Sequence, residues 1–153
     1  MGTLSDDLEI THLSFYENWD PYRNYLVAKE FCGLEDKEGA NIATFTNFAQ
    51  NDQYLTSLHY YLMYLKFGFG RATADAGIEI RRGAMTRDQA INLVKMYDGN
   101  SPRKFFGIYS DYFKMSIEEF ETYIDKFANK KLFEQTNEGW VPKFEVGKPF
   151  LFN

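Results

Sequence analysis

The sequence of 153 residues predicts a mainly α protein: a compact multi-helix domain of about five helices with irregular N- and C-terminal arms. Several runs have apolar residues at helical spacing, and Ser, Thr or Asp capping residues stand at the start of most of them. Glycines follow the ends of most runs, where a left-handed residue commonly closes a helix. The sequence contains no internal repeat and no low-complexity linker, so residues 1–153 are predicted to form a single domain.

The first predicted helix begins at Asp20 and Pro21, because Asp is a favoured cap and Pro suits the first helical position. Gly33 marks its end. Before it, residues 11–16 are expected to form a short extended piece. After it, residues 35–53 have the composition of a loop.

Two helices are predicted on either side of a glycine-rich turn. Residues 56–67 are apolar on almost every side, which is typical of a helix inside a core, and Gly68 ends this run. The next helix is expected from about Ala72 to Arg82 and ends at Gly83. Residues four apart on it share one face, where small side chains permit close packing: Ala72, Ala76 and Ile80.

Two capping boxes predict the starts of later helices. Thr86 with Gln89 begins one helix, which ends at residues 98–99, and Ser116 with Glu119 begins another. Between them, the segment from residue 101 is expected to be helical through residue 109. The helical pattern weakens after residue 131, and the tail from residue 139 to residue 153 is interpreted as an irregular arm.

The composition limits the classes of partner. The net charge of −5 disfavours a nucleic-acid binder, which needs a broad basic surface. The aromatic fraction of 18% is high and indicates either a core or interface built on large flat side chains or a surface covered by another domain or subunit. Cys32 is the only cysteine, so an internal disulfide is excluded, and we interpret it as a small buried residue. The absence of a signal peptide and of a long apolar run predicts a cytoplasmic protein with no membrane contact.

Positive charge is concentrated between residues 66 and 87. Five positive side chains face two negative ones in this window, a net charge of +3, so the remaining residues carry −8. A positive patch on an acidic protein predicts an anionic ligand. We therefore expect substrate or phosphate contacts from Lys66, Gly68, Gly70, Arg71, Thr73, Arg81 and Arg82, with Asp75, Glu79 and His59 as possible supporting residues.

Each of these residues also has a structural interpretation. Gly68–Thr73 precedes a helix N-terminus, which attracts phosphate or carboxylate, but it is equally explained as a tight turn with Arg71 and Asp75 as an ion pair. Near a helix C-terminus, Arg81 and Arg82 complement the helix dipole. For Asp75 and Glu79, salt bridges are favoured over a carboxylate pair that works as a unit or binds metal.

The other polar residues give weaker signals. His59 is interpreted as a histidine satisfied in the core rather than as a general base. Residues 41–47, with Thr44 and Thr46, have hydroxyl and amide groups suited to contact with a sugar. No metal site is predicted, because two separated histidines and one cysteine have no metal-ligand spacing. The sequence shows no catalytic nucleophile motif, and the catalytic residues stay unassigned.

A long block of residues resembles the C-terminal part of the N-acetyl sugar amidotransferases of surface-polysaccharide biosynthesis: Leu65-Lys66-Phe67-Gly68-Phe69-Gly70-Arg71-Ala72-Thr73, Asp75-Ala76, Glu79-Ile80-Arg81, Gly83, Thr86-Arg87 and Tyr97-Asp98-Gly99. Upstream, Trp19-Asp20 and Thr44-Phe45-Thr46-Asn47-Phe48 also look like that family. The resemblance covers about residues 15–130.

The resemblance implies an enzyme related to PP-loop ATP pyrophosphatases, which converts the N-acetyl group of a nucleotide-linked sugar into an acetamidino group for lipopolysaccharide O-antigen. The PP-loop signature, of the type Ser-Gly-Gly-x-Asp-Ser, is absent from these residues. ATP and Mg are therefore expected on a separate PP-loop domain of the same enzyme, and no cofactor is expected on this chain. Glutaminase-type subunits that supply ammonia and a nucleotide sugar are the implied partners.

Two functions follow as hypotheses. The first is the helical domain of a sugar amidotransferase, inactive by itself, which contributes anion and substrate contacts to a site completed elsewhere. The second is a non-catalytic interaction module that docks on a PP-loop domain or a glutaminase subunit or forms a homo-oligomer. The aromatic surplus and the lack of a complete catalytic set favour this second hypothesis.

Overall fold

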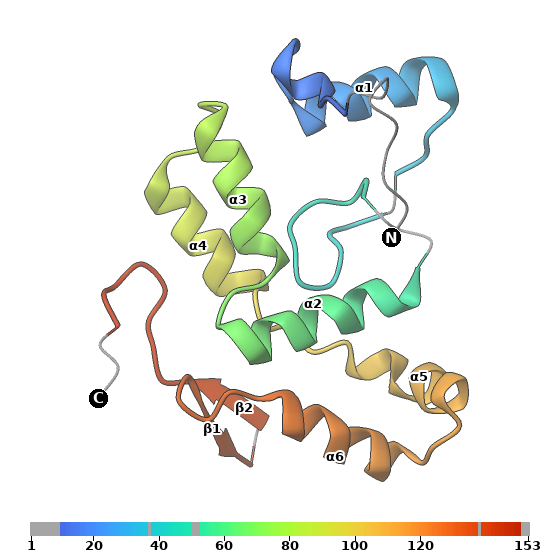
Figure 1. Ribbon diagram of the computed structural model, residues 1–153, viewed down its shortest axis with the longest axis vertical. Coiled ribbons are helices and arrows are strands. Elements are labelled where there is room, and N and C mark those ends of the chain that lie inside the picture. The colour runs from blue at the N-terminus through green and yellow to red at the C-terminus, as the bar shows by residue number, and fades with distance from the viewer. Residues whose placement is uncertain (1–9, 37, 50–52, 138, 151–153) are drawn as a thin grey trace. The chain divides into compact units, whose positions relative to one another are not determined.

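A computed structural model of the chain describes residues 10–36, 38–49, 53–137 and 139–150 (Figure 1). The described residues form six α-helices, two 3-10 turns and one two-stranded sheet, which confirms the mainly α class. The chain divides into two units, residues 1–35 and residues 36–153. No helix in the described ranges combines the length and the apolar character needed to cross a bilayer.

The first unit holds a 3-10 turn at Leu13–Phe15 and helix α1 at Pro21–Cys32. Oδ1 of Asp20 accepts hydrogen bonds from the backbone N–H groups of residues 22 and 23, both at 3.0 Å, which confirms the predicted start. The extended piece expected over residues 11–16 is wrong, because local i to i+3 hydrogen bonds close a turn there instead. No residue of α1 is buried, and Cys32 is exposed, so its interpretation as a buried residue is also wrong.

The second unit contains the remaining elements, drawn in Figure 1. Helices α3 and α4 pack against each other, as do α5 and α6, and α2 contacts α6. The elements are α2 (Tyr54–Phe67), α3 (Arg71–Arg81), α4 (Arg87–Tyr97), a 3-10 turn (Arg103–Phe105), α5 (Phe106–Phe113), α6 (Ile117–Phe127), β1 (Phe133–Thr136) and β2 (Gly139–Pro142).

Two apolar clusters hold this unit together. The larger lies among α2, α5, α6 and β1 and includes Leu65, Tyr109 and Phe133, each at most 1% exposed. The smaller joins α3 to α4 through Ala76, Ala90 and Val94. The small side chains of Ala76 and Ala90 permit close packing here, as predicted for Ala76, whereas Ile80 of the same predicted face is 39% exposed.

Both predicted capping boxes are present. The hydroxyl of Thr86 accepts from the backbone of Gln89, whose side chain accepts from the backbone of Thr86 at 2.9 Å. Ser116 and Glu119 make the same reciprocal pair at the start of α6. Each box satisfies two N–H groups that a helix start would otherwise leave without partners.

The C-terminal arm is more regular than expected. β1 and β2 pair antiparallel, with Phe133 opposite Pro142 and Gln135 opposite Trp140, so the prediction of an irregular arm from residue 139 is wrong for residues 139–142. The indole Nε1 of Trp140 donates to Oδ1 of Asp125 at 2.8 Å and ties this hairpin to α6. Such a contact stabilises strands of four residues that have little local preference of their own.

Candidate functional site

The turn between α2 and α3 holds most of the predicted anion-contacting residues. Gly68 ends α2 in the left-handed conformation, with a φ of 81°. Gly70 is the N-cap of α3 and has no side chain to cap the helix. The first N–H groups of α3 therefore need an acceptor from another part of the chain.

Asp98, at the C-terminal end of α4, supplies this acceptor. Its Oδ2 accepts from the backbone of Gly70 at 2.8 Å and from the hydroxyl of Thr73 at 2.5 Å, and its Oδ1 accepts from the backbone of Thr73 at 3.4 Å. A carboxylate of the chain thus occupies the anion position at this helix N-terminus. A Cβ at Gly70 would lie 2.6 Å from Oδ1, so glycine is needed for this close approach.

Sequence reasoning missed this role, since residues 97–99 are interpreted there as a helix stop followed by a turn, with a functional loop as the alternative. The signal available was indirect: a helix that begins at a glycine has no cap of its own, and Asp98 lies in the same distinctive block as Gly70. The positions are 28 residues apart, and the contact forms only because α4 packs against α3.

A second polar link anchors α3 to the loop before α2. Nε of Arg71 lies 2.8 Å from Oδ1 of Asp75, which confirms the predicted ion pair. The hydroxyl of Thr44 donates to Oδ2 of the same carboxylate at 2.6 Å. Thr44 and Asp75 are 3% and 6% exposed, so the Thr44 hydroxyl is committed to α3 rather than presented to a sugar. The backbone of Ala43 reinforces the link by accepting from Ala72.

The predicted cations do not gather at one place. A helix rises about 1.5 Å per residue, so Arg71 and Arg81 are separated by about 15 Å along α3. Arg82, just beyond the helix, pairs with Glu79 at 2.8 Å, as predicted for a salt bridge. The structure therefore places Gly68, Gly70 and Thr73 at the opposite end of α3 from Arg81 and Arg82.

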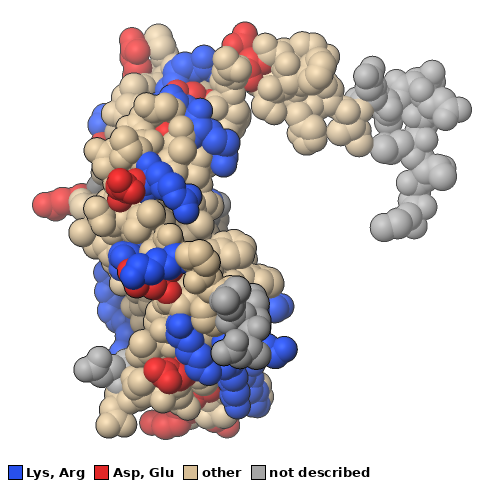
Figure 2. Space-filling model, turned by 90° about the vertical axis from the view of Figure 1, so that its left-hand side faces the viewer, with Lys and Arg blue, Asp and Glu red and all other residues tan. Residues whose placement is uncertain are grey.

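Within the described residues, Lys66, Arg81 and Arg87 make no ion pair. The acidic partners of the window belong to Arg71 and Arg82, so these three cations still give it a net charge of +3. On the face shown in Figure 2, Lys and Arg atoms lie beside Asp and Glu atoms at several places. The positive charge is thus distributed over separate places rather than along one continuous strip on that face.

Lys66 lies at the end of α2 beside exposed aromatic rings. Its Nζ is 5.2 Å from the centre of the Phe67 ring, and the rings of Phe67 and Phe69 stack with their centres 6.0 Å apart. Both rings are about half exposed. The turn therefore presents a cation and two flat apolar faces to solvent.

His59, earlier on α2, is exposed, so its interpretation as a core histidine is wrong.

A pocket of about 280 Å³ opens beside this turn, between Tyr64, Thr73 and Asp98 on one side and the segment 144–150 on the other. Its charged side chains are Asp98, Glu145 and Lys148, which give it a net negative charge. None of the predicted arginines lines it. The pocket itself is therefore poorly suited to a polyphosphate.

Tyr64, at one wall of this pocket, is almost completely buried. Burial raises the pKa of Tyr64 to about 12, and the negative charge of Asp98 contributes to the rise. The phenol therefore stays protonated across the neutral range. Binding chemistry in the pocket that needs a phenolate is excluded at neutral pH.

Replacing Tyr64 by Phe is expected to make the protein less sensitive to alkali. The pKa is raised from 10.0 to about 12, so the folded protein keeps a proton that the unfolded chain releases above pH 10. The free energy of unfolding consequently falls by about 2 kcal/mol as the pH rises through this window. Urea unfolding between pH 9 and pH 12 should show a smaller fall in Tyr64→Phe, while Tyr112→Phe, a change at a tyrosine that is 64% exposed, should follow the wild type. Equal falls in Tyr64→Phe and wild type would contradict this role.

The comparisons with known proteins identify one family. The family described as LPS biosynthesis protein WbpG-like, C-terminal domain, matches residues 42–146, about two thirds of the chain. This range contains the turn, both polar links and most of the pocket lining, whose last residues, 147–150, lie beyond the match. The search of curated proteins found no match.

Proposed function

Because the chain belongs to the family of WbpG-like C-terminal domains of LPS biosynthesis proteins, we propose that it is the helical domain of an ATP- and ammonia-dependent N-acetyl sugar amidotransferase. Involvement in LPS biosynthesis follows from the family itself. The proposal adds the reaction and a nucleotide-linked sugar as substrate. The observation that carries it is the family match over residues 42–146, supported by the resemblance of residues 65–99 to sugar amidotransferases.

In this proposal the domain contributes contacts to the diphosphate of the substrate. Lys66 is the main candidate, because it is exposed and is not neutralised by a carboxylate among the described residues. Arg71 is a supporting candidate, since Asp75 already orients its guanidinium through Nε. Gly70 and Thr73 act indirectly, because their N–H groups are bound to Asp98 and hold the turn in place.

The chemistry that consumes ATP is assigned to a partner. The pocket beside the turn has two carboxylates and one lysine, a lining that does not fit a polyphosphate with its magnesium. A PP-loop domain would supply ATP-dependent activation of the amide oxygen, and a glutaminase subunit would supply ammonia. The residues of this chain bind and orient the sugar nucleotide and carry no step of the reaction themselves.

Replacing Lys66 by Gln is expected to weaken binding of UDP-N-acetylglucosamine about tenfold, because a charge-assisted contact with phosphate is lost. Arg71→Ala should cause a smaller loss, and isothermal titration calorimetry measures both. Lys126→Gln, a change at an exposed lysine on α6, is the matched control and should leave the affinity unchanged. Wild-type affinity in both Lys66→Gln and Arg71→Ala would remove these residues from the site. ATP, titrated in parallel, should bind no more tightly than inorganic phosphate.

The second function, an interaction module, is favoured by a separate observation. An apolar groove of about 290 Å³ lies between α2 and α5, and its lining residues Tyr54, Ile108 and Tyr112 are 46–64% exposed. Exposed apolar surface of this kind commonly marks a place where another protein docks. Light scattering after gel filtration, with and without a PP-loop domain and a glutaminase subunit, tests this function. A monomer that binds neither partner would contradict it.

A further inference from the structure

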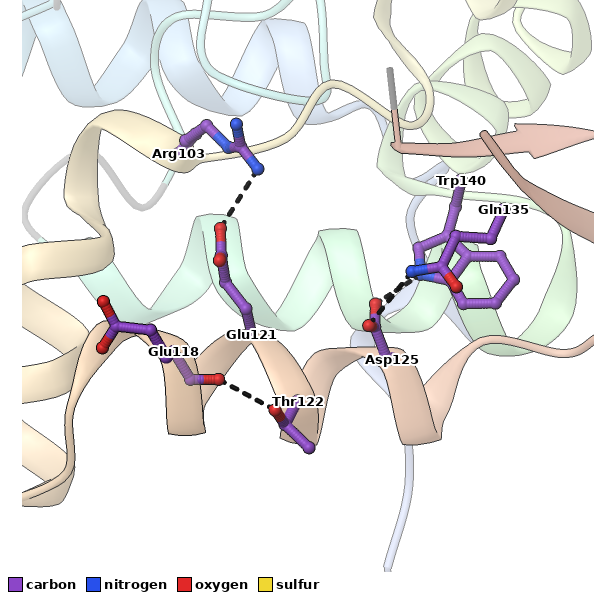
Figure 3. A network of polar contacts seen from close by, with 7 residues as sticks. All are labelled: Arg103, Glu118, Glu121, Thr122, Asp125, Gln135 and Trp140. Carbon is purple, nitrogen blue, oxygen red and sulfur yellow. Dashed lines mark hydrogen bonds and ion pairs between the residues drawn. The ribbon is translucent and has the colours of Figure 1, made fainter. Parts of the chain in front are cut away.

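A third pocket, lined mainly by residues 101–140, has a different character. It has a volume of about 230 Å³ and lies where α2, the segment before α5, α6 and the β1–β2 hairpin meet. Of its lining side chains, Figure 3 shows those of Arg103, Glu121, Asp125, Gln135 and Trp140. Those that carry the argument are Tyr61, Arg103, Glu121, Asp125, Gln135 and Trp140.

Two carboxylates on α6 form the floor of this pocket. Glu121 and Asp125 are one helical turn apart and therefore point from the same face of α6 (Figure 3). An Nη atom of Arg103 donates to Oε1 of Glu121 at 3.1 Å. Asp125 accepts from Nε2 of Gln135 at 3.2 Å and from Nε1 of Trp140 at 2.8 Å.

These contacts hold the polar groups in position and leave some of their donor and acceptor positions available. An ionised carboxylate has about four acceptor positions, and a guanidinium has about five N–H donors. The contacts above engage two acceptor positions on Asp125 and one N–H of Arg103. The pocket therefore offers both acceptors and donors, each held in position by a partner from another segment. Groups that are already held in position cost less entropy to order around a ligand.

The charge balance selects among ligand classes. Among the described lining residues two carboxylates face one guanidinium, so this part of the pocket is net negative and disfavours phosphate. A hard divalent cation needs several oxygen ligands, and the described residues contain no group of three acidic, histidine or cysteine side chains that could hold a metal. The solvent-facing lining is mostly polar, which does not suit a purely apolar molecule. An organic cation finds little free charge, because Glu121 is paired with Arg103 and Asp125 already accepts two hydrogen bonds. The remaining donor and acceptor positions suit a neutral molecule with many hydroxyl groups.

The aromatic walls and the size define the ligand further. Trp140 and Tyr61 offer flat rings, against which the C–H face of a saturated ring can pack. Burial raises the pKa of Tyr61, although contact with Ser101 and the charge of Arg103 oppose the rise, so its hydroxyl remains both donor and acceptor. The volume is below the roughly 300–1,000 Å³ of sites for drug-sized ligands, so it accommodates about one ring.

We propose that this pocket binds one neutral pyranose ring, with hydroxyls on Glu121, Asp125 and Gln135 and a C–H face on Trp140. The inference goes beyond the function proposed above, because it does not require Lys66, the α2–α3 turn or any phosphate group. The ring is that of a free sugar, of a glycan or of a sugar nucleotide. Experiments with and without phosphate on the probe distinguish these sources.

Fluorescence of Trp140 provides a direct readout. The chain has two tryptophans, and Trp19 lies in the other unit, so the Trp19→Phe protein reports on Trp140 alone. Addition of N-acetylglucosamine or its methyl glycoside is expected to change this fluorescence with saturation at millimolar concentration. Inorganic phosphate and UMP should produce no change. A response to phosphate or UMP without a response to the sugars would overturn the proposal, as would silence from every probe.

Asp125→Asn in the same background is expected to weaken sugar binding about tenfold, because one charged acceptor is replaced by a neutral amide of the same shape. Asp111→Asn, on the exposed side of α5, is the matched control and should bind as the parent does. If circular dichroism shows that Asp125→Asn is unfolded, Gln135→Ala replaces it, since Gln135 is exposed on β1. Unchanged sugar affinity in a folded variant refutes the assignment.

The same titration separates the two proposals. Lys66→Gln should leave binding of N-acetylglucosamine unchanged while weakening that of UDP-N-acetylglucosamine. Loss of monosaccharide binding in Lys66→Gln would show that the ring does not occupy this pocket. Normal monosaccharide binding together with an unchanged UDP-sugar affinity in Lys66→Gln would contradict the diphosphate contact and leave the pyranose pocket standing.

Discussion

Replacing Asp98 by Ala is expected to lower the free energy of unfolding by about 3 kcal/mol. The carboxylate accepts two backbone N–H groups and one hydroxyl at the start of α3. Without it, Gly70 and Thr73 keep partly buried donors that no other side chain caps. The favourable interaction of a negative charge with the helix N-terminus is lost as well.

Urea unfolding followed by circular dichroism measures this effect. Asp111→Ala removes an exposed carboxylate from α5 and should change the free energy of unfolding by less than about 0.5 kcal/mol. A double-mutant cycle with Thr73→Val should give a coupling energy of about 1 kcal/mol or more, because the two side chains share a hydrogen bond. A loss below about 1 kcal/mol in Asp98→Ala would show that α3 does not depend on this cap.

The helices could be predicted from the sequence because their signals are local. Asp20 with Pro21 and the two capping boxes lie within four residues of the helix starts that they define. Gly33 and Gly68 adopt the left-handed conformation at the ends where they were expected. Each of these signals acts through backbone groups of neighbouring residues, so the tertiary structure is not needed to recognise it.

The hairpin and the exposed faces could not be predicted in this way. β1 and β2 depend on the Trp140–Asp125 contact and on the burial of Phe133 against α2, which link residues far apart in the chain. Exposure of His59 is likewise set by where neighbouring elements pack. An apolar run of twelve residues predicts a helix, but it does not show which of its sides the fold covers.

The charge pattern around α3 shows the same difference between local contacts, which the sequence predicts, and long-range contacts, which it does not. The spacing of charges correctly predicted the Arg71–Asp75 pair and a salt bridge for Glu79, because residues three or four apart meet on a helix, but it did not name Arg82 as the partner of Glu79. The spacing did not reveal that Asp98 would cap the helix or that Thr44 would bind Asp75. Those two contacts hold the glycine-rich segment between α2 and α3 in place. Lys66 is then the exposed cation beside this segment that is best placed to contact a ligand.

Gly99→Ala is expected to lower the free energy of unfolding by about 3 kcal/mol. Gly99 has a φ of 83°, and the left-handed region costs an L residue about 1 kcal/mol. A Cβ at this position would also lie 2.5 Å from the ring of Tyr64, which is only 7% exposed and has little room to move. Overpacking of a buried ring adds about 1–3 kcal/mol.

Gly83→Ala separates these two contributions. Gly83 has a φ of 76°, but no atom lies within 4 Å of the position that its Cβ would occupy, so only the conformational cost of about 1 kcal/mol is expected. The difference between the two variants in urea unfolding therefore measures the clash with Tyr64. Adding Tyr64→Leu to Gly99→Ala should cost less than the sum of the two single changes, because the smaller side chain relieves the clash. Equal losses in Gly99→Ala and Gly83→Ala would contradict the expected clash with Tyr64. They would mean that the loop after α4 moves away from Tyr64 without disturbing the hydrogen bonds that Asp98 makes with α3.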